Sequence, residues 1–210
     1  MSSEPKRSYA VADIEPQEAY KLASGLVVPR PIGWIGTISN AGVHNLAPYS
    51  FFNMVAISPP TFVVAPSLSG RKDTLDNLLS TKVFTINIVS EQTVEAMNHS
   101  SGTFEADVDE FAESGLTAVT ADTNAAPLVA EAVANFECTV VQSLPVGRPT
   151  DDSPGSAMIV IGEAQRIHVA ERVIDDAFHI DPHALGAVGR HAGPWYNTTS
   201  DSLFQIARPG

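Results

Sequence analysis

Apolar and polar residues alternate along several short stretches of this chain, and a period of two is typical of β-strands. The pattern is clearest over 83–89, where β-branched residues reinforce it. Similar stretches predict strands over 32–39, 61–65, 134–140 and 157–169. Two faces can be read from residue 134 onward: one holds Ala134, Phe136, Cys138 and Val140, and the other holds Asn135, Glu137 and Thr139. The chain is therefore expected to be rich in strands.

Turn and helix signals separate these strands. The turn residues over 40–42 predict that a return strand from Val43 completes a hairpin with 32–39. Three helices are predicted. The first covers 15–25, with Pro16 at its first position and Gly25 just past its end. The second follows a cap at Asp73 and has Leu75, Leu78 and Leu79 on one face, and the third runs from a cap at Ser90 to about Met97. The polar segment 98–124 is expected to be irregular, apart from a helical turn at 109–111.

The order of these elements indicates the fold class. Six or seven strands, a few short helices and no strict strand–helix alternation predict a mainly β fold, a closed Greek-key-like antiparallel barrel with peripheral helices. The stretch 145–155 is rich in Pro, Gly and Asp and is expected to be an exposed loop, because both flanking strands need a partner. We therefore expect one domain over 1–210.

Composition and charge narrow the classes of function. The chain has 44% hydrophobic and 17% charged residues, as globular domains do. A net charge of −12 without a basic patch argues against nucleic-acid binding, and the longest apolar runs are too short to span a membrane. A polar start and a single cysteine, Cys138, favour the cytoplasm. Because the overall field repels anions, an anionic ligand must be held by a few local donors.

The most informative stretch is 30–53, which predicts a strand, a turn, a second strand and then a polar, aromatic loop. That loop can present backbone amides, the Ser50 hydroxyl and the faces of Phe51 and Phe52 to a flat heterocycle. The alternative is an ordinary structural turn in which both phenylalanines are simply buried.

A second candidate site follows in the stretch 67–74. It groups hydroxyl and cationic donors that suit a phosphate, at Ser67, Ser69, Arg71, Lys72 and Thr74. The helix after Asp73 would add free amides, although Asp73 itself would repel a phosphate that it faced. A ring site followed by an anion site suggests a nucleotide-like cofactor. The alternative is a solvated turn before an ordinary capped helix.

Other candidate chemistry is weaker. His179 and His183 have a spacing that can place two imidazoles on one helical face, but Pro182 lies between them and no third ligand is near in sequence, so no metal is predicted. Cys138 is expected in the core, and the nucleophile-elbow, P-loop and dinucleotide-binding glycine motifs are all missing.

Taken together, these segments resemble the flavin reductase-like family of FMN-binding split barrels, which includes flavoredoxin-type proteins. The matching pieces are 30–34, 36–37, 45–53, 72–74, 97–98, 109–111 with 115–117, and 189–190 with Gly193 and Tyr196. Each piece is short, but their order and spacing extend over about residues 15 to 200.

The resemblance implies an FMN held at the interface of a homodimer, with its ring against the loop 45–52 and the neighbouring strand. The residues expected to contact FMN are Trp34, Thr37, Asn45, Leu46, Ala47, Ser50, Phe51, Ser67, Ser69, Arg71, Lys72, Thr74 and Arg190. Arg190 and His191 could instead contact a nicotinamide, and a surface position without a role is an open alternative for His191. Ala192 stands where many family members have a glycine.

The implied activity is that of an oxidoreductase of the flavin reductase type. It would transfer a hydride from NADH or NADPH to FMN and pass electrons to a small-molecule acceptor or a monooxygenase partner. Because the cofactor carries this reactivity, no catalytic side chain is assigned. Whether FMN leaves as a substrate or stays tightly bound is open, and a non-catalytic flavin-binding or electron-storage module is the alternative.

Overall fold

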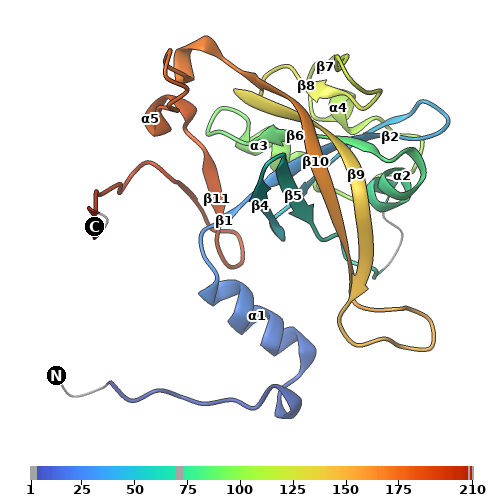
Figure 1. Cartoon of the computed structure of the whole chain (residues 1–210). Helices are drawn as coiled ribbons and strands as arrows, with labels where there is room; N and C mark the ends of the chain where they lie inside the picture. Colours follow the sequence, from blue (N-terminus) through green and yellow to red (C-terminus); the bar gives the residue numbers. More distant parts are fainter. Residues whose placement is uncertain (1–3, 70–72, 208, 210) are drawn as a thin grey trace.

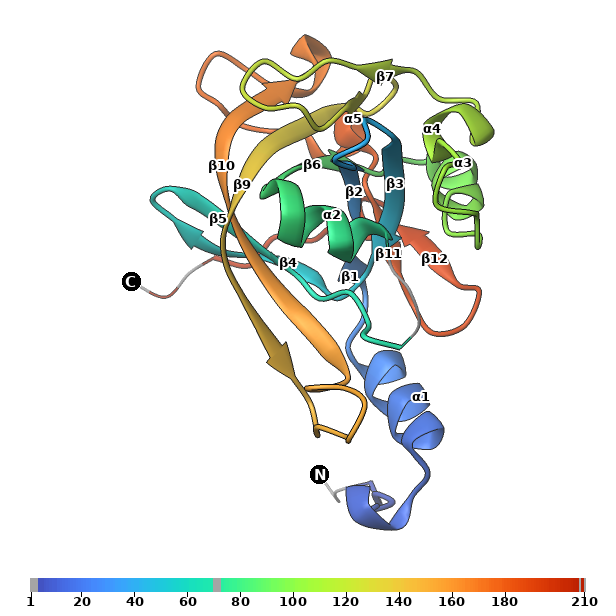
Figure 2. The same cartoon turned by 90° about the vertical axis from the view of Figure 1, so that its right-hand side faces the viewer.

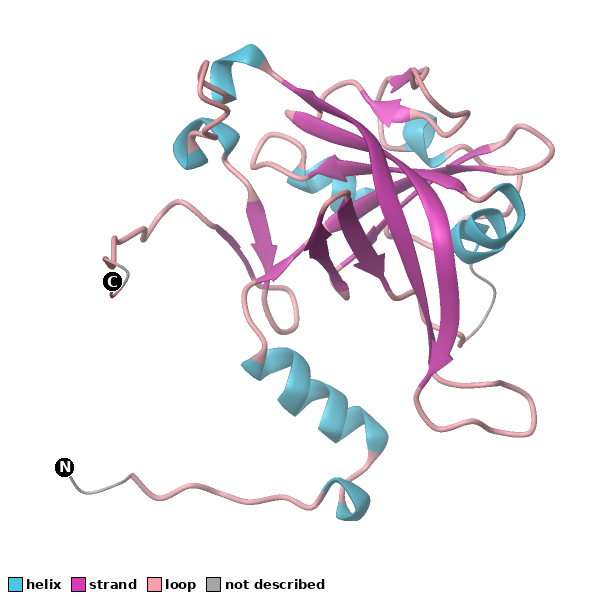
Figure 3. Cartoon of the chain, in the orientation of Figure 1, coloured by secondary structure: helices cyan, strands magenta, loops and turns pink. Residues whose placement is uncertain are grey.

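The computed structural model describes residues 4–69, 73–207 and 209, and strands dominate it (Figure 3). Seven strands form one antiparallel sheet that curls into a barrel-like body, so the expected mainly β fold is confirmed (Figure 1). In sheet order they are β3 (His44–Tyr49), β2 (Gly33–Ile38), β6 (Val83–Ile88), β9 (Ala134–Val146), β10 (Ala157–Val169), β5 (Pro60–Val64) and β4 (Phe52–Ile57).

Smaller elements surround this sheet. A three-stranded sheet combines β1 (Arg30–Pro31), β11 (Val188–Arg190) and β12 (Tyr196–Thr198), and β7 (Ala118–Val119) pairs with β8 (Leu128–Val129). The helices are α1 (Pro16–Leu26), α2 (Asp73–Thr81), α3 (Val94–His99), α4 (Glu110–Glu113) and α5 (Pro182–Leu185), with 3₁₀ turns at Val11–Asp13 and Glu171–Val173. Figure 2 shows α2 against the barrel and α1 projecting away from it. Among the described helices, none has the length and apolarity that a membrane crossing needs.

Strand β2 lies between two hydrophobic cores. Successive side chains of a strand point to opposite faces. Ile35 accordingly packs with Phe84 and Leu78 in one core, whereas Trp34 packs with Met97 in the other. Both faces of β2 are therefore covered, which explains why its sequence is almost continuously apolar.

The predicted hairpin of β2 and β3 is confirmed. Ser39 and Val43 are joined across its turn by a 2.9 Å backbone hydrogen bond, and Gly42 adopts a φ of +84°, which glycine tolerates best. The register sets Thr37 opposite Asn45. The short loop of Ser50 and Phe51 then joins β3 to β4.

Strand β4 is absent from the sequence prediction, which treats Phe52 as part of a loop. Phe52 instead begins the strand and stacks on Phe62 with ring centroids 5.9 Å apart. The register breaks between Met54 and Ala56, so the strand has no regular alternation to detect. As an edge strand, it leaves apolar side chains such as Ile57 exposed.

Two helix boundaries also differ. Helix α1 includes Gly25 and ends at Leu26. Helix α3 begins at Val94 after Thr93, because Ser90 forms a preceding turn in which its amide donates to the Thr93 hydroxyl at 3.1 Å. By contrast, the helical turn near 109–111 is present as α4, and the Asp109 carboxylate accepts from the amides of Phe111 and Ala112.

Candidate functional site

A cleft of about 440 Å³ opens between α1, the end of β3, α3 and the turn joining β11 to β12. Its volume lies in the range typical of sites for small molecules and cofactors. Polar and cationic side chains supply much of its lining: Gln17, Lys21, Arg30, Ser50, Asn98, Ser101, Arg190, His191 and Tyr196. We refer to it as the large cleft.

Arg30 connects three walls of the large cleft. Its guanidinium donates to the carbonyl oxygens of Ser24 and Val27 at the end of α1, and to that of His191 at 3.1 Å. Its Nε lies 3.3 Å from the Ser50 hydroxyl. Because Arg30 is 7% exposed and these bonds use four of its five N–H donors, it acts as a brace that orients the loop carrying Ser50.

Arg190 of β11 lies directly opposite Arg30 in the pairing of β1 with β11, but its surroundings differ. Its guanidinium carbon lies 4.4 Å above the centre of the Tyr196 ring, and it also donates to the Tyr196 hydroxyl. That hydroxyl is 3.4 Å from Asn98 Oδ1. Burial lowers the pKa of Arg190, and the charge of Arg30 adds to the effect. An anion in the cleft would relieve this unfavourable burial of positive charge.

A smaller polar cavity of about 170 Å³ adjoins the large cleft, since Pro48 and Ser101 line both. Its other lining residues include Asn45, Ala47, Tyr49, Asp73, Thr74, Thr103 and Glu110. We refer to it as the small pocket. Asn45 Nδ2 donates to Thr74 Oγ1 at 2.8 Å, so the predicted ring loop and the predicted phosphate segment meet here, 29 residues apart in sequence.

Several residues predicted from the sequence line these two cavities: Asn45, Ala47, Ser50, Thr74, Arg190 and His191. Three other predicted residues, Trp34, Thr37 and Leu46, lie behind the residues that line the cavities. Trp34 is fully buried and donates to Ser100 Oγ at 2.9 Å, and Thr37 is fully buried and accepts from Asn77. The Leu46 amide is already bonded to a Glu110 oxygen at 3.1 Å. In the described structure these three residues pack behind β2 and β3 and line neither cavity, and their contact with a ring stays a prediction.

The phosphate candidates are only partly brought together. Ser67 and Ser69 have hydroxyl oxygens 2.7 Å apart, but neither lines the small pocket. Arg71 and Lys72 lie outside the described residues. Phe51 is half-exposed and meets Tyr20 edge-on at 6.5 Å, so it belongs to the α1 side of the site.

The electrostatic character of the two cavities differs. None of the described residues lining the large cleft is Asp or Glu, although the whole chain carries 24 acidic residues against 12 basic ones. In the small pocket, burial raises the pKa of Glu110 and raises that of Tyr49 to about 12. The large cleft thus favours an anionic ligand, and the small pocket favours neutral forms of its own side chains.

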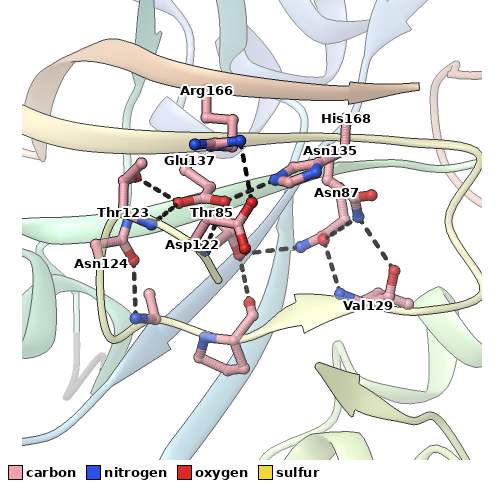
Figure 4. A network of polar contacts seen from close by, with 12 residues as sticks. Thr85, Asn87, Asp122, Thr123, Asn124, Val129, Asn135, Glu137, Arg166 and His168 are labelled. Atoms are coloured by element: carbon pink, nitrogen blue, oxygen red, sulfur yellow. Dashed lines mark hydrogen bonds and ion pairs between the residues drawn. The ribbon is translucent and has the colours of Figure 1, made fainter. Parts of the chain in front are cut away.

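A separate polar cluster lies on the polar face of β9 (Figure 4), and its residues Asp122, Glu137 and His168 line neither cavity. Potential ligand atoms of Asp122, Glu137 and His168 lie within 4.8 Å of one another. However, the fully buried Glu137 carboxylate already accepts from the amides of Asp122 and Thr123, from the Thr123 hydroxyl and from His168. These four donors occupy the acceptor positions of the Glu137 carboxylate. We therefore interpret the cluster as a set of hydrogen bonds that holds the loop 121–124 against β9, and not as a metal site.

Sequence reasoning missed several lining residues. Arg30 and Asn98 lie inside recognised segments, but neither receives a role, since a charged or polar residue in a short motif does not reveal its partner. Tyr20 and Lys21 belong to α1, whose pattern indicates a helix and gives no sign of a cleft. Glu110 is predicted only as part of a helical turn, because a carboxylate beside Phe111 in the sequence gives no sign that it is buried in the structure.

Comparison with known proteins places this geometry in a family. The chain is 37% identical to an uncharacterized protein of Aquifex aeolicus over 90% of this chain and 93% of that one. Its structure is similar to that of nitrilotriacetate monooxygenase component B from Bacillus cereus, with a TM-score of 0.91, 30% identity and coverage of 97% and 100% of the two chains. It is also similar to the 2-nitrobenzoate 2-nitroreductase NbaA of Pseudomonas fluorescens, with a TM-score of 0.86, 27% identity and 96% coverage of each. The family model for the flavin reductase like domain matches residues 24–185, and the chain belongs to this family.

Proposed function

We propose that this protein is an FMN-dependent oxidoreductase of the flavin reductase type that uses NADH or NADPH as hydride donor. The observation that carries the proposal is the union of two cavities: a cationic cleft large enough for a planar ring system and, sharing Pro48 and Ser101 with it, a polar pocket at Thr74. This is the shape and chemistry that a flat heterocycle with a charged tail requires.

The residues present fit FMN. The ring would lie in the large cleft against Pro48 and Ser50. The phosphate would be held by the donors predicted in the stretch 67–74, of which Thr74 lines the small pocket and Arg71 and Lys72 lie outside the described residues. When bound, FMN supplies the capacity to accept a hydride and deliver electrons onward. The protein's own part is orientation: Arg30 holds the Ser50 loop, and the pair of Arg190 and Tyr196 presents a cation and an aromatic face to a nucleotide that approaches the ring.

A homodimer forms part of the proposal. An apolar groove of about 790 Å³ lies on the other side of β1 and β11, with lining residues that include Phe52, Ile88, Phe136, Ile167, Ile174, Phe178, Ile180 and Val188. It shares Ile32 with the large cleft. Helix α1 also projects from the barrel with Leu22 and Leu26 exposed. A second copy of the chain would cover both surfaces and close the cleft against water.

Similarity to two named proteins supports two classes of electron acceptor. Likeness to a nitrilotriacetate monooxygenase component supports delivery of reduced flavin to a monooxygenase partner, and likeness to a nitroreductase supports a small-molecule acceptor. A flavin-binding module without turnover is the competing proposal from another class.

One assay separates these possibilities. NADH and NADPH oxidation is followed with and without added FMN, alongside FMN titration of the protein fluorescence. Turnover that rises with added FMN supports flavin supply to a partner, turnover already saturated by copurified flavin supports a tightly bound cofactor, and FMN binding without turnover supports the module. Failure to bind FMN at all would refute the proposal.

A matched pair of variants tests the site. Arg190→Met should lower the rate with either nucleotide at least tenfold, since it removes the arginine of the large cleft whose guanidinium is not already bonded to backbone carbonyls as that of Arg30 is. Arg148→Met removes an equal charge from the exposed loop between β9 and β10 and should leave the rate unchanged. Equal effects of the two substitutions would exclude the large cleft as the site.

A further inference from the structure

The segment 203–207, near the C-terminus, is an apolar stretch that the rest of the chain leaves uncovered. Leu203, Phe204 and Ile206 are 53%, 79% and 78% exposed. Within the described part of the chain, the segment takes part in no hydrogen bond and in no helix or strand. Figure 1 shows it running away from the barrel, and we refer to it as the C-terminal tail. Uncovered apolar side chains that lie so close together indicate a contact that one chain alone does not make.

The apolar groove beside β1 and β11 is a surface of the same chemistry. Among the described residues that line it, Thr199 alone has a polar side chain, and none is charged. Phe178 and Ile180 belong to its lining and are themselves exposed. The C-terminal tail also carries no charge, since its sequence is Leu-Phe-Gln-Ile-Ala. The groove and the tail are therefore complementary, because each would remove the apolar surface of the other from water.

The tail does not fill the groove of its own chain. The amide and the hydroxyl of Thr199 both donate to the Ala187 carbonyl, at 2.8 and 3.0 Å, which fixes the chain at the edge of the groove. A turn follows, in which the Asp201 amide donates to the Thr198 carbonyl at 3.3 Å, and no residue of the tail lines the groove. A second copy of the chain brings an identical tail, so a symmetric pair could fill both grooves at once.

We propose that the C-terminal tail of each chain lies in the apolar groove of a second copy. The inference rests on the homodimer of the proposed function and goes beyond it by naming the segment that occupies the groove. In an extended segment successive side chains point to opposite sides. Phe204 and Ile206 would therefore face the groove together, and Gln205, the one polar residue of the tail, would face water.

Two adjacent substitutions in the full chain test the contact. Phe204→Asp places a charge against the groove, whereas Gln205→Asp places the same charge on the side that faces water. Sedimentation equilibrium should show the dissociation constant of the dimer raised at least a hundredfold by Phe204→Asp and less than threefold by Gln205→Asp. Because the tail is exposed in the single chain, both variants should keep the native circular dichroism spectrum. Equal effects of the two substitutions on the dimer would overturn the inference.

Disulfide trapping distinguishes a tail in the partner's groove from a tail in its own. One chain carries Phe204→Cys and a second chain of different tag length carries Ile180→Cys, and the mixture is oxidised with diamide. Cys138 is buried in both chains. A covalent dimer of the two different chains is expected, and replacing Phe204→Cys by Gln205→Cys should slow its formation at least tenfold.

The outcomes separate this inference from the proposed function. A chain that dimerises normally with Phe204→Asp, or that forms the disulfide only when both cysteines are in one chain, overturns the inference and leaves the homodimer standing. A native chain that is monomeric at every concentration overturns both the inference and the proposed homodimer. FMN binding, measured separately, decides the rest of the proposed function.

Discussion

Removing the charge of Glu137 gives the sharpest test of the structure. This side chain is fully buried on β9 and receives hydrogen bonds from the Asp122 amide at 2.9 Å, from the Thr123 amide and hydroxyl, and from His168 at 2.6 Å. Burial alone would raise the pKa of Glu137, but the hydrogen bonds, led by that from the Thr123 hydroxyl, outweigh it and hold the pKa at about 2.

The magnitude follows from linkage. A carboxyl whose pKa falls from 4.5 unfolded to about 2 folded contributes roughly 3 kcal/mol to stability at neutral pH. Because the folded pKa is depressed, this contribution is complete above pH 4.5 and is lost as the pH falls through about 2. At pH 3 it should have decreased to about 1.4 kcal/mol. Glu137→Gln keeps the shape of the side chain but not its charge. It should therefore lower the free energy of unfolding by roughly 3 kcal/mol at pH 7 and by about 1.4 kcal/mol at pH 3.

Urea unfolding at pH 7 and pH 3 measures the two differences. Glu113→Gln, which removes an exposed carboxylate, should change the free energy of unfolding by less than about 0.5 kcal/mol at either pH. A loss below about 1 kcal/mol for Glu137→Gln at pH 7 would refute the reasoning. A loss of stability that is as large at pH 3 as at pH 7 would also refute the reasoning, because the effect would then come from packing and not from charge.

Two further predictions concern the proposed dimer and the core. Phe178 lines the apolar groove and is 85% exposed. Its φ of 63° lies in a backbone region that Asp tolerates, so Phe178→Asp should leave the fold intact. The variant should raise the dissociation constant of the dimer at least a hundredfold, as measured by sedimentation. The control is Val119→Asp on β7, which lies far from this groove (Figure 1) and should leave the dissociation constant of the dimer unchanged. A dimer that is unaffected by Phe178→Asp would exclude the apolar groove as the interface. Gly162→Ala should lower stability by about 1–3 kcal/mol, since its new carbon would lie 2.4 Å from the buried Phe84 ring. Gly25→Ala, whose nearest contact is an ordinary 3.7 Å, is the control, and equal melting temperatures for the two would contradict the packing.

The regular parts of this fold are visible in the sequence because local signals and tertiary packing agree there. β6 shows its period of two, and the Gly42 turn determines the hairpin of β2 and β3. β4 is not visible, because an irregular edge strand has no repeated inward face. Strands β1, β11 and β12 are two or three residues long, too short for any periodic signal.

The candidate site is predictable in its segments but not in its contacts. The stretches around 45–52 and 74 are expected to meet, and the bond between Asn45 and Thr74 joins them. Which atoms remain free depends on partners distant in sequence. The Leu46 amide is taken by a carboxylate 64 residues away, and the Trp34 indole by a hydroxyl 66 residues away. No pattern within either segment carries that information.

The two arginines of the large cleft show the same limit in its strongest form. Arg30 and Arg190 are direct partners in the β1–β11 register and carry the same charge. Yet Arg30 directs its donors to three carbonyl oxygens and a hydroxyl, whereas among the described residues the Arg190 guanidinium donates to Tyr196 alone. A guanidinium has five N–H donors, so Arg190 keeps several of them for a ligand. Of the two charges, that of Arg190 is therefore the one an anion in the cleft can use. The family resemblance also selects Arg190, but no local pattern in the sequence explains why it is Arg190 and not Arg30.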